Sequence, residues 1–455
     1  MLEFINKYLL GFSVPCALMA MGLYFLFKLK FFPITKLRQT SRALTKNGKD
    51  SFRALALSLA GTLGVGNIVG VASAIYLGGF GAIFWMWVSA LLASVLKYAE
   101  ILLAMRHKDV SHGTPKGGAP YYIRYVLWRL SPRAAVWLSS IFAILCIANC
   151  LFMGAAMQTS AITEAASVAW KIPPLICGLF LAVITARLLC GGAKAITRLT
   201  SLLVPFMSLF YVVISLAVII PHASMLPLML TRIFRSAFTA ESAAGGIFGF
   251  LLSRSLRFGV MRGLFSNEAG CGTSPTAHIA SSAHPCEQGF MGILEVFIDT
   301  ILLCSMTGFV IMIRYDSVAH LGETPMKMVL EAYSGAFSPL AASLIRPFMA
   351  FMVLCFGFAA ISCLAHYAES CIGFVFQKRK PQRLFIALYS GAVFWGAVAE
   401  PSGAWALSDL TIGIMTLINL AVLFLSRNEI SAKTDEYFAK NKNIFKNDKK
   451  FTKYS

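Results

Sequence analysis

The sequence has few charged residues for its length. Asp, Glu, Lys and Arg make up 13% of its 455 residues, whereas 58% are hydrophobic, and the mean hydropathy is +0.72. A water-soluble chain of this size could not hide so much apolar surface, so a soluble enzyme or binding domain is excluded. We therefore expect an all-α polytopic membrane protein.

Acidic residues are the scarcer of the two charged classes. There are 20 Asp and Glu against 40 Lys and Arg, which gives a formal net charge of +20. In a soluble protein this excess would suggest binding to nucleic acid. Here the basic residues gather in loops and in the tail, as they do on the cytoplasmic side of membrane proteins. The predicted partner is therefore the lipid bilayer and not nucleic acid, and no obligate protein partner is indicated.

Motifs of hydrolytic and metal chemistry are lacking. The eleven cysteines include no C-x-x-C pair, and their positions in apolar runs are typical of packing residues. Neither H-E-x-x-H nor G-x-S-x-G occurs, which disfavours an intramembrane enzyme. His366 and Glu369 are three residues apart, but nothing in the sequence completes a metal site with them. We predict no catalytic residue, no metal site and no cofactor.

Hydrophobic stretches of spanning length occur eleven times. They are 8–27, 54–76, 81–105, 134–158, 173–191, 200–220, 247–280, 288–313, 345–376, 382–399 and 404–426. The first stretch has no small-residue cleavage site and is followed by a basic block, so we interpret it as a retained span and not as a signal peptide.

The basic block after the first stretch predicts the orientation in the membrane. It contains Lys28, Lys30, Lys36, Arg38, Arg42, Lys46, Lys49 and Arg53. By the positive-inside rule this block faces the cytoplasm, which places the N-terminus outside and the C-terminus inside.

The second stretch is interrupted where a membrane helix should be continuous. LAGTLGVGNIVGVASAI, from Leu59 to Ile75, carries three glycines and two polar side chains at its centre: Gly61, Thr62, Gly64, Gly66 and Asn67. A broken helix survives in lipid only where other protein groups or a cavity satisfy the freed backbone. Close packing of small residues, with Gly66 and Gly70 in GxxxG-like spacing, is the alternative explanation.

A second interruption lies in the seventh stretch. RGLFSNEAGCGTSP, from Arg262 to Pro275, places Asn267 200 residues after Asn67. Each interruption opens a set of five stretches, which is the sequence mark of an inverted-repeat transporter with its site at the membrane midplane. A cytoplasmic loop after a shorter seventh span is the alternative.

Five regions follow from this arrangement. They are an extra N-terminal transmembrane helix (1–30), a basic cytoplasmic loop (31–53), a first five-helix repeat (54–221), a second five-helix repeat with its preceding external loop (222–426) and a solvated basic cytoplasmic tail (427–455).

The two interruptions suit a zwitterionic substrate. Backbone amides freed around Thr62, Gly64, Gly66 and Asn67 suit a carboxylate. Carbonyls and hydroxyls around the second break suit an ammonium group, and the aromatic ring there could cover the site. The second group comprises Phe265, Ser266, Asn267 and Gly270.

Ionisable residues inside apolar stretches are costly and so are candidates for function. Glu268 either meets a cation or caps the helix that follows it. Lys97 and Glu100 are three residues apart, and we predict that they form a structural pair. Asp299 lies within FIDTIL, where a functional or gating role and a structural role are both open.

These motifs carry a family resemblance. The chain resembles the alanine/glycine:cation symporter family in the blocks GTLGVGNIVGVASAI, LGGFGAIFWMWV, KYAE, GGAPYYI, GGAKAI, LVPFM, RGLFSNEAGCGTSPTAHIA and FIDTILLC. The resemblance implies a leucine-transporter-type fold with five-plus-five inverted repeats and one extra N-terminal helix. It also implies sodium-coupled uptake of alanine, glycine or a similar small neutral amino acid through a bacterial inner membrane. Gln158 matches a glutamine of the family and is a candidate polar wall of the pocket.

The ninth stretch departs from the family pattern. The family typically has FAFTTILGWSYYGE, where this chain has FGFAAISCLAHYAE from Phe356 to Glu369. Two threonines become Ala359 and Ala360, and a tryptophan becomes Leu364. In this fold those hydroxyls help to hold sodium near the carbonyl end of the first break, at Ala60 and Leu63. The departure leaves sodium coupling and the substrate open.

We therefore predict a secondary active transporter of small neutral amino acids that is coupled to a cation and works by alternating access. If sodium binds weakly at the ninth stretch, Asn67, Asn267 and Glu268 are the alternative ion ligands. A proton-coupled or uncoupled exchanger on the same fold is the nearest alternative, and a channel or an intramembrane enzyme is a more distant one.

Overall fold

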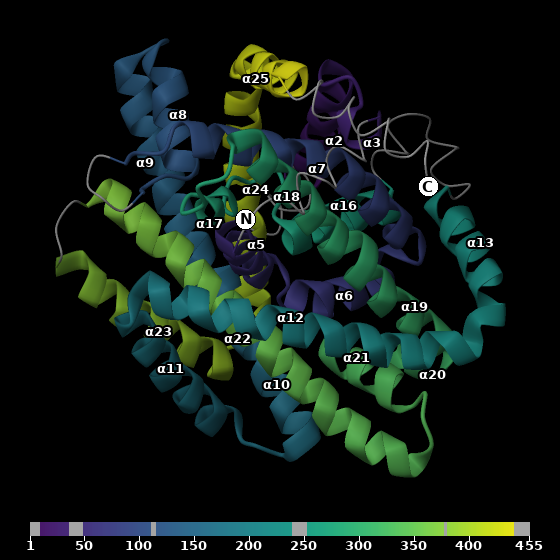
Figure 1. Ribbon diagram of the computed structural model, residues 1–455. Coiled ribbons are helices and arrows are strands. Elements are labelled where there is room, and N and C mark those ends of the chain that lie inside the picture. Colours follow the sequence, from purple (N-terminus) through teal and green to yellow (C-terminus); the bar gives the residue numbers. More distant parts are fainter. Residues whose placement is uncertain (1–9, 36–48, 111–114, 239–252, 377–379, 441–455) are drawn as a thin grey trace, which may run out of the picture.

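The computed structural model describes residues 10–35, 49–110, 115–238, 253–376 and 380–440. Figure 1 shows that these residues form helices that cross and pack in one body. Within the described ranges the only β pairing is an isolated bridge between Asp109 and Lys116. The predicted all-α architecture is confirmed for this part of the chain.

The first half of the chain runs from α2 to α13. Its elements are α2 (Gly11–Lys28), α3 (Phe32–Thr35), α5 (Lys49–Thr62), η2 (Val65–Asn67), α6 (Val69–Gly78), α7 (Gly81–Arg106), α8 (Ala119–Trp128), α9 (Pro132–Asn149), η3 (Cys150–Met157), α10 (Gln158–Trp170), α11 (Pro174–Cys190), α12 (Gly192–Ile219), η4 (Ile220–Met225) and α13 (Leu226–Ala237).

The second half runs from α16 to α25. Its elements are α16 (Arg254–Asn267), α17 (Pro275–His278), α18 (Pro285–Val296), η5 (Phe297–Cys304), α19 (Ser305–Ile313), α20 (Tyr315–Val318), η6 (Ala319–Leu321), α21 (Pro325–Ser334), α22 (Pro339–Val375), α23 (Lys380–Val398), α24 (Pro401–Leu425) and α25 (Arg427–Lys440).

Long apolar helices dominate this architecture. Among the described residues, seven helical runs are long and apolar enough to cross a membrane, and the bent pair α5 and η2–α6 makes an eighth. Three other expected stretches correspond to shorter elements, namely α11, α23 and α16 with α17. Residues 247–252 of the expected seventh stretch lie outside the described part. The protein is thus a polytopic membrane protein, and eleven spans remain an expectation.

The first break is a short irregular segment between α5 and α6. Helix α5 ends at Thr62, Gly64 is extended, and η2 forms a single 3-10 turn. The two halves meet at an angle of 58°. The glycines therefore mark a real interruption of the helix, in addition to any role in close packing.

The second break begins where α16 ends at Asn267. Glu268 takes the left-handed conformation with φ of 51°, and Gly270 and Gly272 follow with φ of 94° and 81°. Glycine adopts such angles without the strain that a Cβ atom brings. The chain resumes a short helix, α17, at Pro275.

Two π-helical segments lie beside these breaks. The segment η3 directly precedes Gln158, and η5 carries Asp299. A π segment widens the helix and turns its side chains relative to a regular helix, and such segments are frequent at functional sites. Neither segment was predicted from the sequence, because no residue type marks a π segment.

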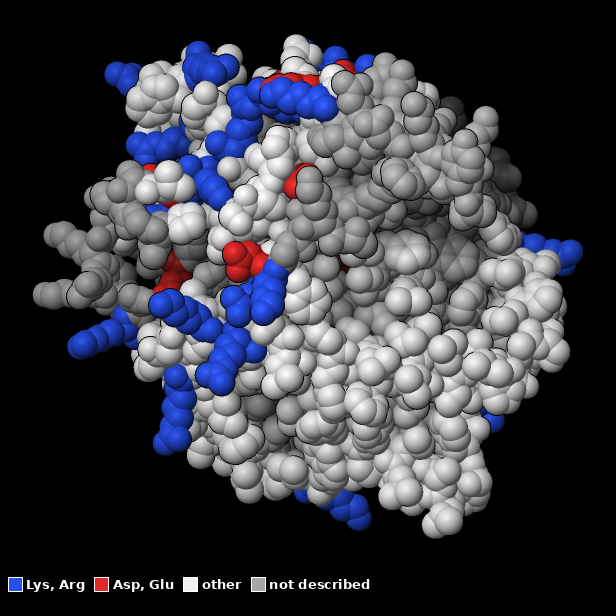
Figure 2. Space-filling view, in the orientation of Figure 1, with Lys and Arg blue, Asp and Glu red and all other residues white. Residues whose placement is uncertain are grey.

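Basic side chains gather on one part of the molecule. Figure 2 shows Lys and Arg over the region of α8 and α25, while much of the opposite end in this view carries none. Helix α8, which follows the predicted cytoplasmic loop, exposes Tyr125 and Trp128. Aromatic side chains of this kind are typical of the membrane–water interface.

The tail is not fully solvated, which corrects the prediction for residues 427–440. These residues form α25, and Ile430, Thr434, Tyr437 and Phe438 are buried. Tyr98 of α7 hydrogen-bonds Thr434 at 2.8 Å, and Phe438 packs on Phe32 and Phe290. The i, i+4, i+7, i+8 spacing of the buried residues is that of one helix face. Residues 441–455 lie outside the described part.

Glu429 fastens the start of α25 to the end of α7. Its Oε1 atom lies 2.5 Å from Arg106 Nε and 2.9 Å from His107 Nε2. The hydrogen bond from His107, together with Arg106, holds the pKa of Glu429 below its ordinary value. A carboxylate with a lowered pKa stabilises the folded form above its ordinary pKa, and this contribution is lost as the pH falls through the folded-state pKa.

We expect Glu429→Gln to loosen α25. A charged hydrogen bond at a partly exposed site contributes about 1 kcal/mol, which corresponds to a roughly fivefold faster amide exchange in residues 427–440. Asp435→Asn is the control, because its pair with Lys30 is exposed. The difference between Glu429→Gln and the unsubstituted protein should vanish at acid pH. Equal exchange at neutral pH would contradict the role of Glu429.

Candidate functional site

The two breaks lie against each other. A Cβ atom added to Gly66 would lie 3.2 Å from Phe265 Cδ1 and 3.4 Å from the Cα atom of Ser266. The first break thus touches the last turn of α16, although about 200 residues separate them in the chain. A side chain at position 66 would press on this contact.

Asp299 of η5 joins the two breaks. Asn67 Nδ2 donates to Asp299 Oδ1 at 2.7 Å and to the Asp299 carbonyl at 3.1 Å. Ser266 Oγ donates to the other carboxylate oxygen at 2.8 Å, as does Thr300 Oγ1 at 2.7 Å. Asp299 is fully buried. One carboxylate therefore holds residues of both breaks, a role that the sequence left open.

The side-chain oxygen of Asn67 is left without a partner. Asn67 Nδ2 donates its hydrogen bond to the carboxylate of Asp299, whereas no hydrogen bond reaches Asn67 Oδ1 within the described ranges. Asn67 is 1% exposed. A buried and unpaired acceptor is costly, which makes it a candidate ligand atom for an ammonium group or a cation.

Asn267 stabilises the second break. Its Nδ2 donates to Thr300 Oγ1 at 3.1 Å, and its Oδ1 accepts from the Ala269 amide at 3.0 Å. Asn67 and Asn267 are therefore linked through the neighbouring residues Asp299 and Thr300.

Gln158 satisfies the backbone of the first break. Its Oε1 accepts from the Val65 amide at 2.9 Å, and its Nε2 donates to the Met153 carbonyl at 3.3 Å. A Cβ atom added to Gly64 would lie 2.8 Å from Gln158 Oε1 and 3.0 Å from the Cβ atom of Ala360. Gln158 and Ala360 thus both border Gly64.

Helix α22 runs alongside α5, where the predicted ion position lies. Cys363 Sγ lies 2.9 Å from the Leu57 carbonyl. The predicted ion-site residues on α22 and at the end of α5 are all fully buried, and Leu364 is buried next to Gly154 of η3. These ion-site residues are Ala60, Leu63, Ala359 and Ala360.

An aromatic and ionic layer covers the second break. The Phe265 ring lies 4.9 Å from the Trp405 ring, and Arg262 Cζ lies 4.4 Å from the Trp405 ring centre. Arg262 also pairs with Asp409 at 3.3 Å. Sequence reasoning missed Trp405 and Asp409 because they lie in the last apolar stretch, far from either motif.

Three predicted site residues have partners of their own. Thr62 Oγ1 donates to the Ser58 carbonyl within α5 at 3.4 Å. The Gly270 carbonyl accepts from Asn419 of α24 at 2.9 Å. Glu268 Oε2 accepts from Thr273 Oγ1 at 2.6 Å, while its Oε1 has no hydrogen bond in the described structure.

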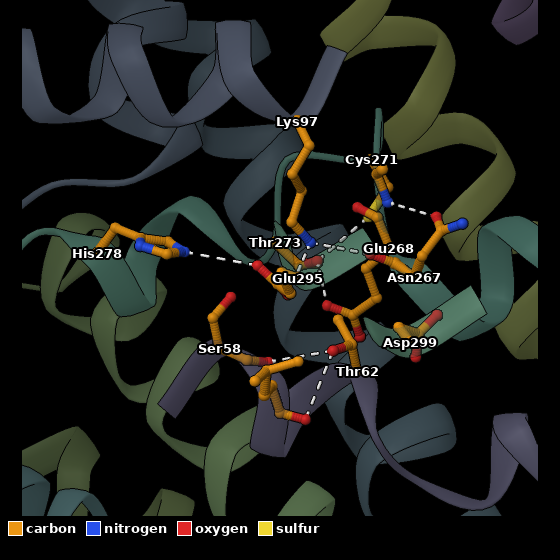
Figure 3. Close-up of polar contacts among 12 residues, drawn as sticks. Ser58, Thr62, Lys97, Asn267, Glu268, Cys271, Thr273, His278, Glu295 and Asp299 are labelled. Atoms are coloured by element: carbon orange, nitrogen blue, oxygen red, sulfur yellow. Dashed lines mark hydrogen bonds and ion pairs between the residues drawn. The ribbon is translucent and has the colours of Figure 1, made fainter. Parts of the chain in front are cut away.

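The predicted pair of Lys97 with Glu100 is wrong. Lys97 instead forms an ion pair with Glu295 of α18 at 3.0 Å (Figure 3), and Glu100 accepts a hydrogen bond from Asn419. The rotation of α7 and its close approach to α18 decide this pairing, so spacing along one helix could not predict it. No group of three or more His, Cys, Asp and Glu residues in the described ranges could hold a metal ion of the usual protein-bound kind.

A helical membrane protein with polar residues gathered at two facing helix breaks belongs to the class of membrane transport proteins. Comparison of sequences defines the family. The chain belongs to the sodium:alanine symporter family, whose model matches residues 1–453.

Curated relatives cover almost the whole chain. It is 32% identical to the putative sodium/proton-dependent alanine carrier protein YrbD of Bacillus subtilis, over 93% of this chain and 90% of the relative. It is 32% identical to the probable sodium/glutamine symporter GlnT of the same organism, over 92% of this chain and 86% of the relative. It is 30% identical to the sodium/alanine symporter AgcS of Methanococcus maripaludis, over 97% of this chain and 98% of the relative.

We expect Asn67→Ala to abolish amino acid uptake while the protein still folds. The substitution removes the unpaired Oδ1 atom and also the hydrogen bond to Asp299, at a cost of about 1–3 kcal/mol in the free energy of unfolding. Uptake per folded molecule in proteoliposomes measures the effect.

The matched control is Asn149→Ala, because Asn149 is equally buried and accepts from Thr411 of α24 at 3.0 Å. This variant should lose comparable stability and keep its uptake. Normal uptake by Asn67→Ala, or equal loss by both variants, would contradict a ligand role for Asn67.

Proposed function

We propose that this protein imports a small neutral amino acid together with a sodium ion across the cytoplasmic membrane of a bacterium. We propose further that it has the five-plus-five inverted-repeat fold of the leucine-transporter type, with one extra N-terminal helix, an external N-terminus and a cytoplasmic C-terminus. The observation that carries the proposal is the buried link from Asn67 through Asp299 to Ser266, which ties two matched helix breaks around an unpaired acceptor.

The substrate is proposed to lie between the two breaks. Its carboxylate would face the backbone amides at Gly64 and Gly66, near the start of α6, and its ammonium group would donate to Ser266 Oγ. Ser266 and the backbone near Asn267 would border the other side. Phe265, Gln158 and Leu364 would limit the space for the side chain, with Thr62 and Gly270 as further candidates at the ends of the breaks.

A small and uncharged side chain is favoured by the surroundings. Phe265 lies against Gly66, and Leu364 and Ala360 on α22 are apolar and fully buried. A charged side chain would lose its hydration here against Phe265, Ala360 and Leu364, whose side chains offer it no hydrogen bond. The names of the relatives, which refer to alanine and glutamine, support a neutral amino acid.

The ion is proposed to bind at the carbonyl end of α5. Backbone oxygens of Ala60 and Leu63 and the Oδ1 atom of Asn67 would be its ligands, because sodium prefers oxygen. Ala359 and Ala360 can add no side-chain oxygen. We therefore propose weak sodium binding there, with Asn267 and Glu268 as alternative ligands.

Transport would proceed by alternating access. The breaks are joined to η5 through Asp299, so α5–α6, α16–α17 and α18 with η5 would move together. We propose that this group rocks against α9–α10, α11, α12, α22 and α23. Closing one side of the site would then open the other side.

Counterflow in proteoliposomes tests the proposal. Vesicles loaded with unlabelled alanine should accumulate labelled alanine transiently, because a carrier exchanges its substrate whereas an enzyme or a channel does not. The same vesicles are then tested with a panel of neutral and charged amino acids, in sodium and in choline buffers. Sodium-dependent uptake of small neutral amino acids is expected. Absence of counterflow with every amino acid would sink the proposed function.

Uptake in choline buffer also distinguishes the sodium symporter from a proton-coupled or uncoupled exchanger. Loss of the two hydroxyls at Ala359 and Ala360 is the observation that favours a proton-coupled or uncoupled exchanger. Uptake that is equal in sodium and choline buffers would select this alternative.

We expect Ala359→Thr with Ala360→Thr to lower the sodium concentration for half-maximal uptake at least threefold. Threonine oxygens at these positions would add ligands for a hard cation. Uptake is measured over a sodium series. The control is Ala350→Thr, which makes the same change at another buried position of α22. An unchanged sodium dependence in a double variant that folds and transports would contradict this account of α22.

A further inference from the structure

A lysine is buried next to the site without being part of it. Lys97 lies on α7 with a side chain that is 0% exposed. Its ammonium group donates to the carbonyl oxygen of Asn267 at 2.9 Å and lies 3.0 Å from Glu295 Oε1. Figure 3 shows this ammonium between Glu295 and the end of α16. None of the roles proposed above uses it.

Two glycines of α18 make room for this lysine. A Cβ atom added to Gly292 would lie 3.0 Å from Lys97 Cγ, and one added to Gly289 would lie 2.6 Å from Tyr98 Cδ2. Larger residues would push α18 away from α7. The glycines therefore let the Lys97 stem lie against α18, so that its ammonium reaches Glu295.

The carbonyl that Lys97 binds is the end of a broken helix. Asn267 is the last residue of α16, and Glu268 turns into the left-handed conformation. The last carbonyls of a helix lack partners within it and carry the negative end of its dipole, so a positive charge fits there. Lys97 fixes the main chain of Asn267, while Thr300 and Ala269 fix its side chain.

More than one carboxylate lies near the ammonium group of Lys97. Glu295 is fully buried and is also 3.6 Å from His278 Nε2. Lys97 is the only Lys or Arg that pairs with Glu295 among the described residues. Glu268 and Glu100 are also close enough to act on the Lys97 charge. Removing Lys97 alone would leave Glu295 without its cation, so a test that removes Lys97 must also neutralise Glu295.

We propose that Lys97 is a positioning residue for transport. Its ammonium is a cation fixed to the protein, and it holds the end of α16 so that Ser266 stays on Asp299 and opposite Gly66. The inference rests on the proposed function for its transport readout only. It assigns to Lys97 no contact with the substrate.

The first test is the double variant Lys97→Gln with Glu295→Gln, which removes the ion pair without leaving a buried charge. We expect the alanine concentration for half-maximal uptake to rise about tenfold, with the yield of monodisperse protein within twofold. A merely structural role would lower the yield and leave the half-saturating concentration unchanged.

The control is Arg346→Gln with Glu331→Gln, which removes a pair of 2.8 Å between α22 and α21. It should leave half-saturation unchanged. Counterflow by the unsubstituted protein is run beside both, and its absence counts against the proposed function.

The second test does not depend on transport. Ser266 Oγ lies 3.3 Å from the thiol of Cys304, so Ser266→Cys should form a disulfide with Cys304 when oxidised in a background without the other cysteines. Cyanogen bromide cleavage at Met291 separates the two cysteines, and linked fragments report the bond. With the double variant, the disulfide between positions 266 and 304 should form in less than one third of the amount found when Lys97 and Glu295 are kept.

The proposal would be overturned if the disulfide yield and the alanine concentration for half-maximal uptake were both the same with and without the ion pair. If the double variant does not fold, Glu295→Gln alone decides the question, because it keeps Lys97 on the Asn267 carbonyl. Disulfide formation close to that of the Ser266→Cys protein that keeps Glu295 supports the proposal. A loss of linking as large as that expected for the double variant overturns it.

Discussion

The two breaks depend on one constraint, which is that backbone groups freed inside an apolar interior must find partners. The structure meets it with side chains from other helices. Gln158 accepts from the Val65 amide, and Thr307 donates to the Asn67 carbonyl at 2.7 Å. Lys97 and Asn419 donate to the carbonyls of Asn267 and Gly270. An unpaired group of this kind costs about 1–3 kcal/mol, so these four contacts together decide whether the breaks can exist.

The same contacts limit how the protein can move. Each break is hydrogen-bonded to other helices, namely η5 and α19 for the first break and α7, η5 and α24 for the second. A break cannot shift alone without losing these bonds. Motion of the breaks together with η5 keeps the Asp299 link intact, whereas contacts with α22 and Gln158 would have to change. The hydrogen bonds thus favour rigid-body motion over local unfolding.

The sequence was informative where a residue type is out of place. Glycine, asparagine and serine in apolar runs located both breaks. The partner of Lys97 could not be predicted, because it depends on how closely α18 approaches α7 at Gly289 and Gly292. The π segments carry no residue signature. Helix α25 could have been found, since Ile430, Thr434, Tyr437 and Phe438 share one helical face, but the high charge of the tail hid this pattern.

The two breaks also differ in what they can still bind. At the second break the Asn267 carbonyl already accepts from Lys97, and the Asn267 amide already has partners in Thr300 and Ala269. A mobile cation there would have to compete with a fixed ammonium for the Asn267 carbonyl. At the first break, Asn67 keeps an oxygen without a partner in the described structure. This asymmetry favours a fixed cation at the second break and an exchangeable one at the first. The sodium ion would then be bound mainly by α5 and Asn67. Its binding would be weak because the alanines of α22 add no side-chain oxygen.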